Sequence, residues 1–314
     1  MRVGIVGGTG FFGHYLVRSL VAAGYQPTLL VRPGSEDKVV CPERCSIISG
    51  DVTDRGALER LCQDCHAIIY CVGILREDRK RNVTFEQTQY QGAVATQQAA
   101  YEAGVSRFLL MSAYGVGSDG TDYQQTKWRA EQAALDSPMD VTIFRPSVMF
   151  GDPHERMEFA SQLYFDMIRP PLPAISFFAG WNPSRPVMMS PVHVQDVADA
   201  FVAALGNEET IGQTIPLGGP ESLSWRQMLG RIAETVDRRK IMVPMPTGLM
   251  KIAAHALDWL PAFPVTVDQL TMLEQGNVVG PEPLTRLLRR APRAFDATNL
   301  GYLCLARQDL ISAQ

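Results

Sequence analysis

Two side chains that could carry proton chemistry stand four residues apart near the middle of the chain. Tyr123 and Lys127 occupy positions i and i+4, which share one face of a helix. A cationic lysine can lower the pKa of a neighbouring phenol, which then passes a proton to or from a substrate oxygen. The same spacing is common on ordinary helix surfaces, so the pattern needs support from the elements around it.

A glycine-rich turn at the start of the chain gives that support. Residues 3–6 read as a short buried strand, and Gly7, Gly10 and Gly13 then lead into a helical pattern. In such a turn the first glycine permits the tight bend, the second lets backbone approach phosphate, and the third lets the helix pack on the strand. Because a helix N-terminus attracts anions, we predict that a dinucleotide pyrophosphate binds here.

The residue after the second predicted strand indicates which dinucleotide binds. An acidic side chain at this place binds the 2′-hydroxyl of NAD, whereas an arginine accommodates the 2′-phosphate of NADP. Arg32 stands there, and the first carboxylate after it is Glu36. A guanidinium binds phosphate through charge-assisted hydrogen bonds. We therefore predict NADP (NADPH) as the cofactor, with a solvated arginine at a strand end as the alternative.

Strands and helices alternate through the first half of the chain, which predicts an α/β fold. The pattern is that of a Rossmann-type, doubly wound parallel sheet, whose ligand lies beyond the carboxyl ends of the strands. The expected strands after the first cover residues 27–32, 46–50, 67–72, 107–112 and 140–145, and the expected long helices cover residues 85–103 and 123–135.

The alternation stops beyond Gly151, where prolines become frequent. We expect an NADP-binding Rossmann domain at residues 1–150, to which residues 188–218 return. Residues 151–187 and 219–314 are expected to form a smaller, mainly helical C-terminal lobe for substrate or docking.

Composition excludes several classes of protein. The 314 residues are 46% apolar and 20% charged, so the chain can bury a full core. A net charge of −4 without charged blocks argues against nucleic acid as a partner. No apolar run reaches the roughly 18 residues of a membrane span, and no secretory signal precedes the first strand. We expect a cytoplasmic protein that could still lie peripherally on the inner face of the cell membrane.

Two cysteine pairs have spacings that also occur in zinc sites. They are Cys41-x3-Cys45 and Cys62-x2-Cys65. Cys62 falls in a helical run and Cys65 begins the next expected strand, where thiols are ordinary core residues. We predict no metal site, and the pattern gives no case for disulfides.

Several motifs, taken in order, resemble a known superfamily. The glycine motif and Tyr123-x3-Lys127 are followed by Arg145-Pro-Ser-Val-Met-Phe-Gly151 and Val194-x-Asp196-Val-Ala. Over about residues 1–220 they resemble the extended and atypical short-chain dehydrogenase/reductases, with the NAD-dependent epimerase/dehydratase type of fold. Later runs, Leu223-Ser-Trp-Arg226, Val243-Pro-Met-Pro246 and Thr266-Val-Asp-Gln-Leu270 to Glu274-x2-Asn277, are similar to the NADPH-binding accessory subunit of respiratory complex I, the alpha-subcomplex-9-like family.

This resemblance implies a tightly held NADPH without established turnover, on the peripheral arm of complex I near the membrane. In active superfamily members the fifth strand ends in two hydroxyl residues, and the second orients the substrate carbonyl. The matching pair here is Ser112 and Ala113, so the second hydroxyl is missing unless the register shifts by one. A site that keeps its cofactor groups but lacks this hydroxyl fits binding better than turnover.

The candidate site residues follow from the motifs and from the carboxyl ends of the strands. The candidate catalytic residues are Ser112, Tyr123 and Lys127. The candidate cofactor-binding residues are Gly7, Thr9, Gly10, Phe11, Phe12, Gly13, Arg32, Asp51, Val52, Cys71, Val72, Gly73, Met111, Tyr123, Lys127, Pro146 and Val148.

Two features of the C-terminal third could contact a partner. A helical apolar stripe either covers the core of the lobe or docks on a partner or membrane surface. Its residues are Leu249, Ile252, Ala253, Ala256, Leu257 and Leu260, widened by Met250, Ala254 and Trp259. Four arginines at i, i+3, i+4 and i+7 are predicted to share one helix face until Pro292 ends the helix, and they either face water or bind anionic lipid or an acidic subunit. These are Arg286, Arg289, Arg290 and Arg293.

The sequence thus favours an NADPH-binding protein with little or no turnover that is an accessory or assembly component of NADH:quinone oxidoreductase (complex I). Its expected partners are NADPH, peripheral-arm subunits and the membrane surface, reached through the C-terminal lobe. One alternative is an active NADP-dependent reductase or epimerase/dehydratase that uses Tyr123 and Lys127 on a small substrate. Another is a sensor of the NADPH/NADP ratio.

Overall fold

A computed structural model describes residues 1–74, 76–78, 83–156, 158–182, 184–257 and 267–304. The chain forms two compact units. Unit 1 comprises Met1–Pro146, Val194–Pro216 and Arg286–Arg289, and unit 2 comprises the described residues of Ser147–His193, Leu217–Thr285 and Arg290–Gln314.

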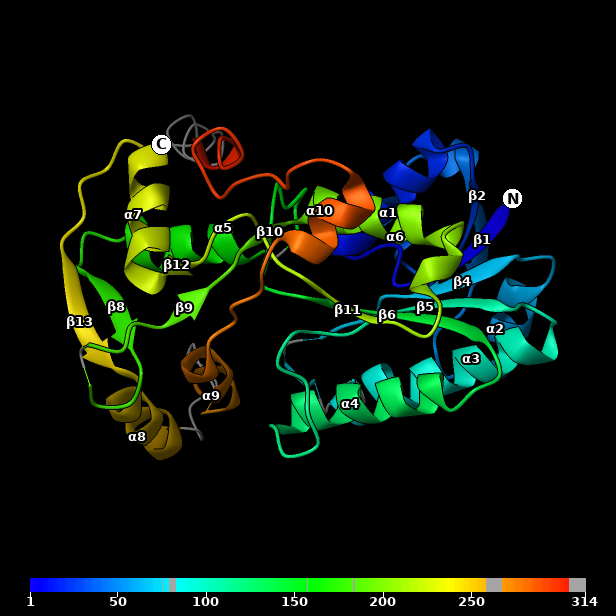
Figure 1. Ribbon diagram of the computed structural model, residues 1–314, viewed down its shortest axis with the longest axis horizontal. Helices are drawn as coiled ribbons and strands as arrows, with labels where there is room; N and C mark the ends of the chain where they lie inside the picture. The colour runs from blue at the N-terminus through cyan, green and yellow to red at the C-terminus, as the bar shows by residue number, and fades with distance from the viewer. Residues whose placement is uncertain (75, 79–82, 157, 183, 258–266, 305–314) are drawn as a thin grey trace. The chain divides into compact units, whose positions relative to one another are not determined.

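A seven-stranded sheet is the centre of unit 1 (Figure 1). Its order is β11-β6-β5-β4-β1-β2-β3, and strands β1 to β6 run parallel. β1 has β2 on one side and β4 on the other, so the strand order reverses at β1. In such folds the ligand binds at this point, beyond the carboxyl ends of the strands. The predicted Rossmann-type sheet is confirmed. Its strands are β1 (Arg2–Val6), β2 (Gln26–Val31), β3 (Ser46–Ser49), β4 (Ala67–Tyr70), β5 (Arg107–Met111), β6 (Asp140–Pro146) and β11 (Thr214–Leu217).

Helices cover both faces of this sheet (Figure 1). Helices α1 (Phe11–Ala22) and α6 (Val194–Leu205) pack against each other on one face. Helices α2 (Arg55–Cys62), α3 (Gly92–Glu102) and α4 (Asp122–Leu135) cover the other. All four residues of β4 are buried, because a strand covered on both faces is apolar throughout. Short helical turns are η1 (Glu36–Lys38), η2 (Pro42–Arg44), the π-helix η4 (Glu86–Gln91) and η6 (Glu208–Thr210).

Unit 2 is built from short strand pairs and helices. β8 (Ala174–Phe178) pairs in parallel with β13 (Met242–Pro246), and β7 (Met149–Phe150) with β10 (Val192–His193). β9 (Met188–Met189) is antiparallel to β12 (Leu223–Ser224). The core gathers large side chains such as Phe150, Tyr164 and Phe295. The helices are α5 (Phe159–Leu163), the π-helix η5 (Tyr164–Ile168), α7 (Trp225–Thr235), α8 (Thr247–Leu257) and α9 (Val267–Gln275); α10 (Glu282–Leu288) crosses the boundary between the units.

The structure corrects two expectations about helices. The helix predicted at residues 85–103 contains the π-helical turn η4 before α3. Helix α10 ends at Leu288, and Arg289 has a left-handed φ of 55°, so the four arginines do not share a helix face.

Part of the predicted apolar stripe can be placed. Leu249 and Ile252 lie exposed on α8, and Ala254 is buried. Trp259 and Leu260 lie outside the described residues. Over the described ranges, no helix combines the length and apolar character that crossing a membrane requires.

Candidate functional site

The glycine turn joins β1 to α1 through very close backbone contacts. Gly7 has a φ of 102°, and a side chain there would meet the Cys71 carbonyl group at 2.9–3.0 Å. A Cβ at Gly13 would lie 2.3 Å from the Gly7 carbonyl oxygen, so only glycine lets α1 start so near the turn. These are two of the roles that the spacing predicted.

Gly10 leaves this turn open toward a ligand. It is the N-cap of α1 and makes no side-chain cap, and the first turn of α1 contains no acidic residue. A Cβ at Gly10 would meet only the Gly7 oxygen, at 3.4 Å. Backbone N–H groups at an uncapped helix N-terminus bind anions, so the turn fits a pyrophosphate.

Not every predicted residue of the turn faces this opening. Phe12 is buried, and its ring lies 5.0 Å from that of Phe201 of α6, so it belongs to the core between the two helices. Phe11 is half-buried and packs edge-on against Tyr15. Thr9 is half-buried within the turn itself.

The next parallel strands bring Arg32 and Asp51 together at the carboxyl edge. Both side chains are exposed, directly after β2 and shortly after β3. Asp51 accepts hydrogen bonds from the Thr53 N–H at 2.8 Å and the Thr53 hydroxyl at 2.6 Å. The hydroxyl contact chiefly holds the pKa of Asp51 below its usual range, and the charge of Arg32 contributes. Val52, beside Asp51, is half-buried and packs on the core of unit 1.

The end of β4 lies between the glycine turn and Lys127. The Cys71 thiol donates to the Val6 carbonyl oxygen at 3.2 Å, and burial raises the pKa of this thiol to about 12. A Cβ at Gly73 would lie 3.9 Å from Lys127 Nζ. Val72, between Cys71 and Gly73 in the sequence, packs on the core of unit 1. The structure therefore brings the turn, residues 71–73 and Lys127 together.

Lys127 is a buried cation on α4. Its side chain is 6% exposed, and Nζ donates to the Met111 carbonyl oxygen at 3.2 Å. Burial lowers the pKa of Lys127 to about 8, although the nearby Glu131 carboxylate opposes this shift. Glu131 is itself buried and accepts two hydrogen bonds from Arg145, one of them at 2.8 Å.

Tyr123 differs from the expectation in its pKa. Burial raises the pKa of its phenol, whereas the sequence predicted that Lys127 would lower it. The reason is geometric: Lys127 Nζ lies 5.7 Å from the centre of the Tyr123 ring and donates to Met111. In this arrangement desolvation, rather than a neighbouring positive charge, sets the pKa of the phenol.

Ser112 and Ala113 lie just beyond β5 and differ in their exposure. Ser112 is 4% exposed, and its hydroxyl oxygen is sealed from solvent without a hydrogen-bond partner among the described residues. Its N–H donates to the Phe144 carbonyl oxygen at 2.7 Å, which fixes the backbone at this point. Ala113 is partly exposed and offers a methyl group.

The last two predicted contacts fall in different units. Pro146 ends β6 and is buried in unit 1. Val148 belongs to unit 2, where it packs against the core.

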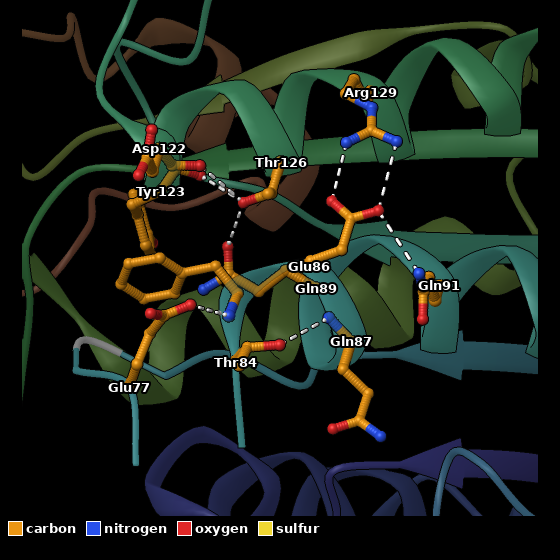
Figure 2. A network of polar contacts seen from close by, with 11 residues as sticks. Glu77, Thr84, Glu86, Gln87, Gln89, Gln91, Asp122, Tyr123, Thr126 and Arg129 are labelled. Carbon is orange, nitrogen blue, oxygen red and sulfur yellow. Dashed lines mark hydrogen bonds and ion pairs between the residues drawn. The ribbon is translucent and has the colours of Figure 1, made fainter. Parts of the chain in front are cut away.

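A polar network that the sequence did not predict supports Tyr123 (Figure 2). Gln89, 2% exposed within the π-helical turn, donates from Nε2 to the Ile74 carbonyl oxygen at 2.9 Å. The Thr126 hydroxyl lies 3.3 Å from Gln89 Oε1 and 3.0 Å from the Tyr123 carbonyl oxygen. No spacing in the sequence marks Gln89, because the contact depends on the π-turn that rotates it inward.

The loop before η4 is fastened to the same network (Figure 2). Glu77 Oε1 accepts the Phe85 N–H at 2.9 Å, and the Phe85 ring packs edge-on against that of Tyr123 with centroids 5.7 Å apart. On the solvent side, Arg129 of α4 forms an ion pair with Glu86 at 2.7 Å. The backbone around Tyr123 is therefore held from both sides.

Other proteins match this chain. Residues 7–164 match the family described as NAD(P)H-binding. NADH dehydrogenase (ubiquinone) 1 alpha subcomplex subunit 9, mitochondrial, of Arabidopsis thaliana is 27% identical over 299 residues, which is 89% of this chain and 70% of that protein. Divinyl chlorophyllide a 8-vinyl-reductase, chloroplastic, of Oryza sativa subsp. indica is 27% identical over 276 residues, 82% of this chain and 64% of that protein.

A solved structure shows the same fold over nearly the whole chain. It is UDP-glucuronic acid 4-epimerase from Bacillus cereus in complex with UDP-glucuronic acid and NAD, with a TM-score of 0.73 and 16% identity. The match covers 98% of this chain and 100% of that one. The resemblance predicted from the motifs is confirmed, both in the relatives and in the fold.

Gly13→Ala tests the turn. The added Cβ would lie 2.3 Å from the Gly7 oxygen, so α1 must shift away. We expect NADPH affinity to fall at least about tenfold, with a loss of about 1–3 kcal/mol of stability. Fluorescence titration and chemical denaturation measure both. The control is Gly230→Ala in α7, where a Cβ meets nothing within 4 Å; it should bind NADPH normally and gain about 0.5–1 kcal/mol. Equal NADPH affinity in the two variants would contradict this account.

Lys127→Met tests the buried ammonium. The folded-state pKa of Lys127 is about 8, against 10.5 for an unperturbed lysine, so the unfolded chain binds more protons between these two values. Wild-type stability should therefore rise with pH across that window, by up to about 3 kcal/mol relative to the methionine variant. Chemical denaturation at the two ends of the window measures the difference. Lys38→Met, at an exposed site, is the control. A wild-type-minus-variant difference that stays constant with pH would show that the ammonium is not desolvated.

Proposed function

The chain belongs to the NAD(P)H-binding family, and from this we propose that it binds NADP(H) with little or no turnover, as an accessory or assembly component of NADH:quinone oxidoreductase (complex I). The observation that supports the proposed low turnover is the position of Ser112. Its hydroxyl is sealed from solvent, and the partly exposed Ala113 offers only a methyl group. A substrate carbonyl would lack the hydroxyl that orients it in active members, a loss of about 3 kcal/mol in the transition state.

The proposed cofactor residues fall into two groups. The turn from Gly7 to Gly13 would hold the pyrophosphate at the N-terminus of α1. Arg32 and Asp51 would hold the adenosine ribose, and Lys127 the nicotinamide ribose. A bound nicotinamide ring would supply hydride transfer, and the chain would supply position and a proton at the Tyr123 hydroxyl.

A complex I relative supports the proposed place in the cell. A plant relative that aligns with most of this chain is a subunit of mitochondrial complex I. We infer a cytoplasmic protein that lies peripherally on the inner face of the cell membrane and contacts peripheral-arm subunits of the complex. Gentle purification from native membranes tests this: NADPH and complex I subunits should accompany the protein. Its recovery as a free soluble protein would rule out the accessory role.

An active reductase or epimerase/dehydratase is the second candidate, and the pKa of Lys127 favours it. A pKa of about 8 lets the ammonium lose and regain its proton near neutral pH. A relative is also named as a reductase. Tyr123→Phe separates the candidates, because it removes only the hydroxyl. Turnover that disappears in this variant while NADPH binding persists would establish an enzyme.

Arg32→Ala tests the choice of cofactor. Loss of the guanidinium should weaken NADPH binding by about tenfold, or ~1.4 kcal/mol, and leave NADH binding nearly unchanged, because only NADPH carries the 2′-phosphate. Arg44→Ala removes an exposed arginine from the same connection between β2 and β3 and serves as the control. Fluorescence titration of the wild type and both variants with each nucleotide measures the six affinities. Equal wild-type affinities for NADPH and NADH would show that Arg32 does not select the cofactor.

A further inference from the structure

Two segments of unit 2 lie side by side where they enter a strand pair. The Ala174 N–H at the start of β8 donates to the Ile241 carbonyl oxygen, just before β13, at 2.9 Å. The Arg238 guanidinium donates to the Arg169 carbonyl oxygen at 2.7 Å, and the Lys240 ammonium donates to the Pro170 carbonyl oxygen. These contacts hold the two approaches together. We call residues 165–172 and 238–241 the basic corner.

Large apolar side chains stand in solvent at this corner. Leu172 is 70% exposed and Ile241 is 75% exposed, and both lie next to the start of the strand pair. Phe165 is 40% exposed, and the Arg169 guanidinium lies 5.8 Å from the centre of its ring. Apolar side chains exposed together and rimmed by polar groups mark an interaction surface.

Cations gather around these apolar side chains. The basic corner contains Arg169, Arg238, Arg239 and Lys240 and a single carboxylate, Asp166, with Asp237 directly beside it. Three of the four cations are exposed, on a chain whose net charge is −4. Burial and the charge of Arg238 lower the pKa of Lys240, which agrees with crowded cations.

Few backbone groups of the basic corner need water as a hydrogen-bond partner. Pro170, Pro171 and Pro173 flank Leu172 and carry no N–H group. The Arg169 and Pro170 carbonyl oxygens already accept hydrogen bonds from Arg238 and Lys240. Few backbone groups would therefore lose a water partner if Leu172 entered an apolar phase, where an unpaired donor is costly.

We propose that the basic corner binds an anionic lipid surface, with Leu172 and Ile241 entering the headgroup region and the arginines on the lipid phosphates. Apolar side chains among cations are the composition of surfaces that lie in a membrane interface. Arginine is also common in protein–protein interfaces, but lysine is depleted there and charged residues are depleted from the interface core. This proposal rests on the peripheral membrane location proposed in the previous subsection, and it names the surface that would contact the membrane. It involves no residue of the proposed nucleotide site. It also replaces the four-arginine helix face that the structure does not form.

The test uses the full-length protein and vesicles of phosphatidylcholine with and without phosphatidylglycerol. Co-sedimentation should show binding only to vesicles with the anionic lipid, weakening as salt is added. The charge variant is Arg169→Ser with Arg239→Ser, because the other two cations hold backbone carbonyl groups. We expect it to lower the partition coefficient at least about tenfold. The apolar variant, Leu172→Ser with Ile241→Ser, should lower it by a similar factor.

Two matched variants make the result specific. Arg286→Ser with Arg289→Ser removes two exposed arginines from unit 1 and should leave vesicle binding unchanged. Leu249→Ser with Ile252→Ser removes the exposed apolar pair of α8 and should also leave it unchanged. Wild-type protein that ignores anionic vesicles, or a charge variant that binds as the wild type does, would overturn the proposal. So would binding lost only in the α8 variant.

NADPH titration of the same variants keeps this proposal separate from the function of unit 1. Each variant should bind NADPH as the wild type does, which also shows that it is folded. Vesicle binding without NADPH binding in the wild type would refute the nucleotide site and leave the basic corner supported.

Discussion

The burial of one ammonium group constrains the carboxyl edge of the central strands. An unpaired buried charge is expensive, so Lys127 depends on groups supplied by β5 and by its own helix α4. Met111 at the end of β5 gives its carbonyl oxygen, Glu131 on α4 gives a carboxylate, and the Tyr123 ring gives its face. Glu131 is buried in turn and relies on Arg145 from β6. Because these groups come from neighbouring strands and one helix, the register of β5, β6 and α4 is fixed by electrostatics as well as by packing.

The same constraint explains why Tyr123 and Lys127 do not act as the spacing alone suggests. A spacing of i and i+4 places two side chains on one face of a helix, but it does not orient their polar ends. The Lys127 ammonium donates its hydrogen bond to the end of β5 and contacts only the ring of Tyr123. The pKa of the Tyr123 phenol is therefore set by desolvation. The pair is therefore arranged first to place a cation beside residues 71–73, where a nicotinamide ribose would lie. Proton transfer by the phenol would need a further group that lowers its pKa.

The parts of the structure that the sequence predicted are those set by local backbone geometry. Gly7 and Gly13 could be assigned because contacts of 2.3–3.0 Å exclude any side chain there, and the strands because buried parallel strands are apolar throughout. The sequence did not predict the π-turn that carries Gln89 or the end of α10 at Leu288. A helical period continues through residues 286–293 in the sequence, yet Arg289 turns into a left-handed conformation. Periodicity shows which residues could share a face, but not where the chain stops being a helix.

A bound nucleotide could also stabilise the protein without taking part in a reaction. A ligand that binds only the folded chain stabilises it by mass action, by about 4 kcal/mol at a thousand times its Kd. The glycine turn, residues 71–73 and Lys127 meet at the carboxyl edge of the central strands, so a nucleotide there would join β1, β4 and α4 at once. In the proposed function, Ala113 and the sealed Ser112 hydroxyl would remove a substrate contact without weakening any of these contacts. Loss of turnover would then be compatible with retention of the cofactor, because the groups proposed to hold the nucleotide also hold the fold.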